Sequence, residues 1–139
     1  MDRPRMEITG RCHCGAVGYR AVIDPEAVSI CHCTDCQRLT GSAFRLTVRA
    51  RAQDFTLTGT APRCYLKHGD SGARRFQYFC GDCGSPIYTT GEGEAAQIVG
   101  IRAGTIDQRA QLVPRSQIWG RSRLPWLERL GAIPCRDRE

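Results

Sequence analysis

The chain has 139 residues, 41% of them hydrophobic and 24% charged, so it can bury an ordinary core without needing cross-links. No apolar stretch has the length of a membrane span or the layout of a signal peptide, so we expect a cytoplasmic protein with no membrane partner. The formal net charge is +6, but seven thiolates on two zinc ions would lower it to about +3. Arginines are spread from Arg3 to Arg138, so we do not expect a nucleic-acid partner.

Short segments separated by turn residues predict a mainly β protein. The clearest segment is apolar at every second position from Val17 to Ile23, and Asp24 and Pro25 end it. Glycines in residues 68–72 predict a hairpin loop between two later strands. In chain order the predicted strands are Glu7–Arg11, Cys14–Ile23, Val28–Cys33, Ala43–Ala50, Phe55–Leu57, Arg63–Lys67, Arg74–Phe79, Pro86–Thr90, Gln97–Arg102 and Ser116–Gly120.

Only two stretches favour helix. Asp35–Leu39 is long enough for one helical turn, which Gly41 would close. Leu124–Leu130, with Pro125 at its start, is the one segment predicted as a genuine short helix. We find no repeat or linker, so we predict a single domain over residues 1–139.

Seven of the nine cysteines fall into three tight groups. Residues two or three apart seldom reach disulfide geometry, and a reducing compartment disfavours disulfides, so the groups indicate metal ligands. Zinc takes four protein ligands in a structural site and three in a catalytic site, so seven thiols are enough for one structural site and one catalytic site. The groups are Cys12-His13-Cys14, Cys31-His32-Cys33-Thr34-Asp35-Cys36 and Cys80-Gly81-Asp82-Cys83.

The first and last groups together predict a closed four-sulfur site. Cys12 and Cys14 lie two apart near a strand, where side chains at that spacing share a face. Cys80 and Cys83, followed by Gly84, have the spacing of a zinc knuckle, in which backbone amides donate to the sulfurs. The alternative is that these four residues are buried free thiols.

The middle group predicts a site with an open position. Cys31 and Cys33 would share a strand face, and Cys36 would arrive from the following turn. An ion held by three thiolates can lower the pKa of a thiol or water at its fourth position. Two alternatives stay open: a second structural ion completed by Cys64, Cys135 or a histidine, and one cluster that shares all seven thiols.

The histidines are predicted not to be ligands. His13 and His32 each separate two cysteines, so on a strand their rings point away from the metal and are packed or hydrogen-bonded. His68 lies in a polar loop and is expected to be exposed.

Polar side chains surround the middle group and suit an anionic thiol substrate. We predict Gln37, Arg38 and Ser42 as substrate-binding residues, with Thr40 and Arg45 as further donors nearby. Taken singly, an arginine in this sequence is more readily explained as a solvated side chain, which is our expectation for Arg45, Arg74 and Arg75.

These residues resemble the glutathione-dependent formaldehyde-activating enzyme family, which includes the centromere protein V domain. The resemblance covers nearly the whole chain in order, and its most specific parts are the three cysteine groups. One position departs from it, because many relatives have histidine where this chain has Gln117. The matching segments are residues 10–17, 31–44, 79–88, 104–107 and 124–126.

The resemblance implies a β-tent fold of short antiparallel strands with two zinc ions. One zinc is held by the equivalents of Cys12, Cys14, Cys80 and Cys83, and a catalytic zinc by those of Cys31, Cys33 and Cys36. It also implies a carbon–sulfur lyase that joins glutathione and formaldehyde reversibly as S-hydroxymethylglutathione. The alternatives are a structural zinc module without catalysis and a glutathione-binding carrier.

Overall fold

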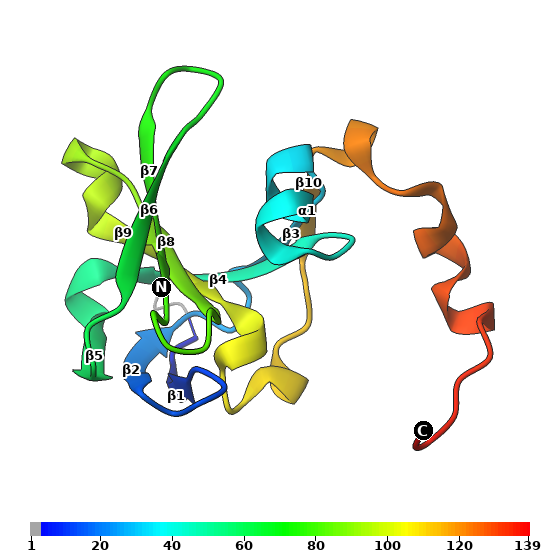
Figure 1. Cartoon of the computed structure of the whole chain (residues 1–139), viewed down its shortest axis with the longest axis horizontal. Helices are drawn as coiled ribbons and strands as arrows, with labels where there is room; N and C mark the ends of the chain where they lie inside the picture. Colours follow the sequence, from blue (N-terminus) through cyan, green and yellow to red (C-terminus); the bar gives the residue numbers. More distant parts are fainter. Residues whose placement is uncertain (1–3) are drawn as a thin grey trace.

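The computed structural model describes residues 4–139, which form two β-sheets, one α-helix and several 3₁₀ turns (Figure 1). The small sheet has the order β1-β2-β5 and the large sheet the order β10-β3-β4-β9-β8-β7-β6. Residues 1–3, which the domain prediction includes, lie outside the described residues. The strands are β1 Met6–Arg11, β2 Val17–Ile23, β3 Val28–Cys31, β4 Arg45–Arg51, β5 Phe55–Gly59, β6 Arg63–His68, β7 Arg74–Phe79, β8 Pro86–Thr90, β9 Ile98–Arg102 and β10 Ser116–Ile118.

Apolar residues at every second position bury one face of each sheet in a shared core. In β2 the buried positions run from Val17 to Ile23, as the alternation predicts. In the large sheet Val48 and Ile101 are register partners on β4 and β9, and both are fully buried. All of these side chains belong to one hydrophobic cluster, in which each large member contributes about 1.5 to 3 kcal/mol by burial.

The same alternation gives the large sheet a second, polar face. Because Val48 points into the core, Arg45, Thr47 and Arg49 lie on the other side of β4 or at its end. Thr47 is the register partner of Arg102 on β9, so polar residues of neighbouring strands meet on this face. The candidate site lies on this face.

The mainly β prediction is confirmed, and several strand bounds need correction. The hairpin β6–β7 and strand β8 lie where the sequence predicts them. β2 begins at Val17 rather than Cys14, because a turn with Gly15 at φ 83° follows Cys12. The strands are not all antiparallel, since β10 pairs with β3 in parallel.

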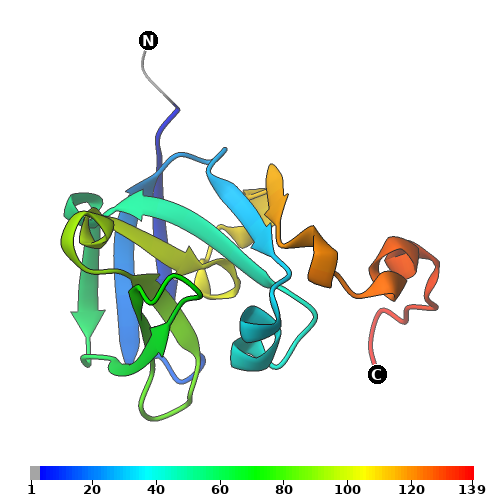
Figure 2. The ribbon, with the colours of Figure 1, turned by 90° about the horizontal axis from the view of Figure 1, so that it is seen from above.

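The helix predictions are also corrected. The short turn expected at Asp35–Leu39 is an α-helix, α1 (Thr34–Thr40), and Gly41 ends it with φ 65°. The segment Pro125–Ala132 is instead a 3₁₀ helix with no buried residue, so it has no packed face to stabilise an α-helix. This C-terminal segment extends away from both sheets in two views (Figures 1 and 2). Within residues 4–139 no helix combines the length and apolarity needed to cross a membrane.

Gly10 lies where β1 packs closely against Tyr19 and against the segment after β9, so a substitution there can test this packing. A Cβ at this position would collide with the Tyr19 ring and lie 2.6 Å from the backbone oxygen of Thr105. We expect Gly10→Ala to lower the free energy of unfolding by about 1 to 3 kcal/mol, the usual cost of overpacking, as measured by denaturant titration. Gly104→Ala is the control, because a Cβ there meets no heavy atom within 4 Å. Equal stability of the two variants would contradict this packing.

Candidate metal centres

Four cysteines from two distant turns meet at one point. Cys12 and Cys14 lie in the turn between β1 and β2, and Cys80 and Cys83 lie in the turn between β7 and β8. Their four sulfur atoms all lie within 4.8 Å of one another. The group therefore joins an edge of the small sheet to the large sheet.

The sulfur spacing fits a tetrahedral metal ion. Sγ of Cys14 lies 3.6 Å from Sγ of Cys12 and 3.7 Å from Sγ of Cys80. A tetrahedron with zinc–sulfur bonds of about 2.3 Å has edges of about 3.8 Å, whereas a disulfide would bring two sulfurs to about 2.05 Å. The donor set and its spacing thus suit an ion such as zinc.

Local hydrogen bonds favour the thiolate form at Cys12 and Cys83. At Cys14 the backbone hydrogen bond from Ala16 is outweighed by the neighbouring thiols and by burial, which raise the pKa to about 12. The backbone N–H of Val17 donates to Sγ of Cys12 at 3.3 Å, and that of Asp82 donates to Sγ of Cys80 at 3.4 Å. Hydrogen bonds from the Ser85 hydroxyl and from backbone amides lower the pKa of Cys83 to about 5. Gly84, at φ 81°, turns the chain back so that its amide bonds to the carbonyl of Cys80.

A second group contains Cys31, Cys33 and Cys36, whose sulfurs also lie within 4.8 Å of one another. Cys31 ends β3, and Cys36 lies in the first turn of α1. Cys33 is the N-cap residue of α1 rather than part of a strand, and its sulfur accepts the backbone N–H of Cys36 at 3.2 Å. The predicted convergence of these three sulfurs is confirmed, but Cys33 reaches it through a helix cap and not through a shared strand face.

The two groups are separate, and no fourth ligand joins the second. Among residues 4–139, no further His, Cys, Asp or Glu ligand atom lies in the three-sulfur group. Cys64 and Cys135 are exposed and lie outside both groups. This arrangement does not favour one cluster of seven thiols, and it leaves one position of a tetrahedral ion at Cys31, Cys33 and Cys36 free of protein ligands.

The thiols of the second group have opposed tendencies to ionise. Burial raises the pKa of Cys36 to about 12, and the adjacent Cys33 sulfur adds to the effect. Burial also opposes ionisation of Cys33, but hydrogen bonds from the backbone and thiol of Cys36 bring its pKa below the usual value. Cys33 is therefore the thiolate that the chain itself favours.

The histidines lie outside both cysteine groups, as predicted. His32 is buried, and its Nε2 lies 2.7 Å from Oε1 of Gln117, the position that departs from many relatives. His13 is exposed rather than packed, although its backbone N–H donates to Ser85. His32 and Gln117 thus link the end of β3 to β10.

A cavity of about 400 Å³ opens beside the three-sulfur group on the polar face of the large sheet. Cys31, Cys33 and Cys36 form part of its wall. No acidic residue lines it among the described residues. Five cationic residues do, namely Arg45, Arg49, Lys67, Arg75 and Arg102.

Two of these cations are buried and share one acceptor. Arg45 is 5% exposed and Arg102 is 9% exposed. Nη1 of Arg45 and Nη2 of Arg102 donate to Oε1 of Gln77 at 2.9 and 2.8 Å. Burial, and next the charge of Arg45, lowers the pKa of Arg102 to about 9. The expectation that Arg45 is a solvated side chain is therefore wrong, because its strand turns it into the cavity.

The residues predicted to bind substrate lie outside the cavity wall. Nε2 of Gln37 donates to the backbone oxygens of His32 and Ser122 at 2.8 and 3.1 Å, so this side chain links α1 to the end of β3 and to the 3₁₀ turn Gly120–Ser122. Arg38 and Ser42 are exposed and do not line the cavity. Their substrate contacts remain predictions without support from their placement.

Sequence reasoning missed Arg102, Gln77 and Thr89. Each of them lines the cavity from a different strand, β9, β7 or β8. The sequence did contain a signal for two of them. Gln77 and Arg102 lie in predicted strands between apolar neighbours, so their side chains are expected on the polar face of the sheet. Strand order was needed to show that these positions share one face.

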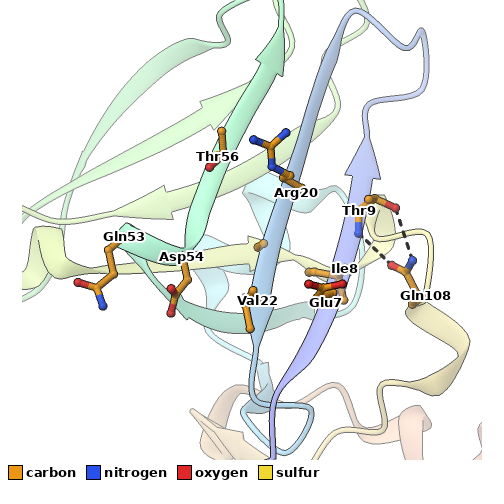
Figure 3. A pocket seen from close by; sticks show the side chains of 10 residues that line it. Glu7, Ile8, Thr9, Arg20, Val22, Gln53, Asp54, Thr56 and Gln108 are labelled. Atoms are coloured by element: carbon orange, nitrogen blue, oxygen red, sulfur yellow. Dashed lines mark hydrogen bonds between the residues drawn. The ribbon is translucent and has the colours of Figure 1, made fainter.

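A second cavity lies elsewhere, on the small sheet. It measures about 550 Å³, and its wall carries both acidic and basic residues, including Glu7, Asp54 and Arg20 (Figure 3). Gln108 accepts the backbone N–H of Thr9 at 3.1 Å at one end of it. No cysteine lines this cavity, so the candidate site is the cavity beside the three-sulfur group.

Comparison with known families agrees with the cysteine geometry. The sequence profile of the glutathione-dependent formaldehyde-activating enzyme family matches residues 7–122. The chain belongs to this family. The match includes all seven clustered cysteines and extends through β10.

A solved structure supports the fold. A Rhodobacter sphaeroides protein, whose crystal structure was determined as a structural genomics target, is similar with a TM-score of 0.61 at 19% sequence identity. The similarity covers 78% of this chain and 98% of that one. No functionally curated protein matches the chain. The solved structure therefore supports the fold of this family member and leaves its activity open.

We expect purified protein to contain up to two zinc ions per chain, measured by elemental analysis. The ion at Cys31, Cys33 and Cys36 should be removed first by a chelator, because it has fewer protein ligands. Folded full-length protein that takes up no metal after zinc is supplied would contradict both sites.

Proposed function

We propose that this chain is a zinc-dependent carbon–sulfur lyase that acts on a thiol–aldehyde adduct, within a single zinc-binding domain. Glutathione and formaldehyde, joined as S-hydroxymethylglutathione, are the best candidates for the two halves of the adduct. One observation carries the proposal: three sulfurs without a fourth protein ligand line a cavity with five cations. A thiol bearing negative charge fits that cavity.

The reaction is the addition of a thiol to a carbonyl. The thiol loses its proton, its sulfur bonds to the carbonyl carbon, and the carbonyl oxygen takes up a proton to give a hemithioacetal. A zinc ion at the three-sulfur group would lower the pKa of the incoming thiol and stabilise the leaving sulfur in the reverse direction. Cys31, Cys33 and Cys36 would hold the ion, while the cavity cations would attract and orient the substrate.

Two alternatives give different outcomes. A structural zinc module would complete both ions with protein ligands, which the three-sulfur group of the described residues does not favour. A glutathione carrier would have the same open site but no turnover. Formation of the adduct must therefore be measured as a rate above the uncatalysed background.

The two metal sites should respond differently to loss of one ligand. Cys83→Ser removes a ligand from the site that joins the β1–β2 turn to the β7–β8 turn, so the protein should melt much earlier or fail to fold. Cys36→Ser should largely retain the fold, because its group spans only the short segment from Cys31 to α1, while adduct formation should fall to background.

The measurement combines thermal melting, zinc content and hemithioacetal turnover on both variants. Cys135→Ser is the matched control, because this exposed thiol lies outside both groups and should change none of the three readouts. If Cys36→Ser unfolds the protein as severely as Cys83→Ser, the second site is structural and the lyase proposal fails.

A further inference from the structure

The buried guanidinium groups of Arg45 and Arg102 have no carboxylate partner among the described residues. The ion pairs within residues 4–139 involve other side chains, all of them on the surface or partly exposed. Gln77 supplies a single neutral oxygen to both groups. Burying two like charges in contact with one neutral acceptor is costly unless an anion compensates them.

Unused hydrogen-bonding groups mark where an anion would bind. Nε of Arg45 and Oγ1 of Thr89 are buried and have no hydrogen-bond partner. Both residues are more than nine-tenths buried, and both line the cavity with Arg102 and Gln77. Nη1 of Arg102 donates to the hydroxyl of Thr47 at 2.9 Å, so this nitrogen already has a partner. The arginine pair is thus held in place and still has N–H groups available.

The register places this pair beside the three-sulfur group. Cys31 on β3 and Arg45 on β4 are direct antiparallel partners, and Thr47 and Arg102 are partners on β4 and β9. Directly opposed residues on one face have Cβ atoms about 4.5 to 5.5 Å apart. A ligand whose sulfur meets the cysteines would therefore extend along the sheet toward the arginines.

We infer that Arg45, Arg102 and Thr89 form a binding site for a carboxylate of the substrate, a role that rests on the proposed lyase function. The planar guanidinium groups match the two oxygens of a carboxylate, and the Thr89 hydroxyl can donate to one of them. The carboxylate belongs either to the thiol or to the aldehyde. The substrate class is thus a thiol–aldehyde adduct that bears a carboxylate.

The first test compares two thiols that differ only in charge. Zinc-loaded parent protein should bind 3-mercaptopropionate about 10- to 100-fold more tightly than 3-mercaptopropionamide, measured by calorimetry at fixed salt. In Arg45→Gln and Arg102→Gln this preference should largely disappear, with the affinity for the amide nearly unchanged. A parent protein that binds both thiols equally would overturn the inference, whatever the variants do.

The stability of the variants separates a binding role from a structural one. Removing one of two neighbouring buried charges relieves their repulsion, so neither variant should melt below the parent protein. Arg51→Gln is the control, because Arg51 is exposed at the end of β4, does not line the cavity and should leave the carboxylate preference unchanged. Arg38→Ala tests the alternative that the carboxylate binds at α1, as the sequence predicts. Loss of the preference in Arg38→Ala, with its retention in Arg45→Gln, would move the carboxylate site to α1 and overturn the inference.

A second arm identifies the source of the carboxylate. With the neutral thiol 2-mercaptoethanol, glyoxylate carries a carboxylate on the aldehyde and formaldehyde carries none. If the glyoxylate adduct turns over faster than the formaldehyde adduct and Arg102→Gln abolishes this difference, the carboxylate belongs to the aldehyde. If the two adducts turn over equally while 3-mercaptopropionate is still preferred in binding, the carboxylate belongs to the thiol. Because binding is measured without turnover, a protein that prefers the carboxylate yet forms no adduct would reject the lyase and keep the site.

Discussion

Four sulfur atoms crowded within 4.8 Å are the constraint on which the rest of the structure depends. Four thiolates at this spacing would repel one another strongly, and a metal ion between them would compensate that repulsion. The group joins the β1–β2 turn of the small sheet to the β7–β8 turn of the large sheet. A metal ion bound there would help to hold one face of each sheet against the shared core, while the other face of the large sheet lines the cavity.

That free face balances two kinds of charge. Three sulfurs at the end of β3 and the start of α1 supply the negative side, and the arginines of β4 and β9 supply the positive side. Burial and the charge of Arg45 favour the neutral form of Arg102, whereas ionised Cys36 or Cys31 would favour the protonated form. A zinc ion at the three cysteines would reduce the charge there from −3 to about −1. The two buried arginines carry more charge than that, so an anion from outside the chain would complete the balance.

The sequence was sufficient for the parts of the site that depend on local spacing. Cysteines two or three residues apart converge through one turn or one helix cap, so the three-sulfur group and each half of the four-sulfur group could be predicted from spacing alone. The union of the two distant halves followed from the four ligands that a structural zinc ion takes. Arg45 could not be placed, because its burial depends on β4 lying between β3 and β9. The parallel pairing of β10 with β3 depends on a long-range contact that no local sequence pattern shows. The 3₁₀ form of Pro125–Ala132 depends on the absence of packing contacts, which the local pattern does not show either.

The four-sulfur group also joins residues that are far apart in sequence. Cys14 and Cys80 are 66 positions apart, so an ion bound to both closes a long loop in the chain. Closing a loop of this length removes entropy from the unfolded chain worth about 4 kcal/mol in the cross-link model. Long-range contacts of this kind also slow the search for the native topology. Metal bound before the sheets form would thus act as a reversible cross-link, and the folding rate of this protein would depend on when zinc arrives.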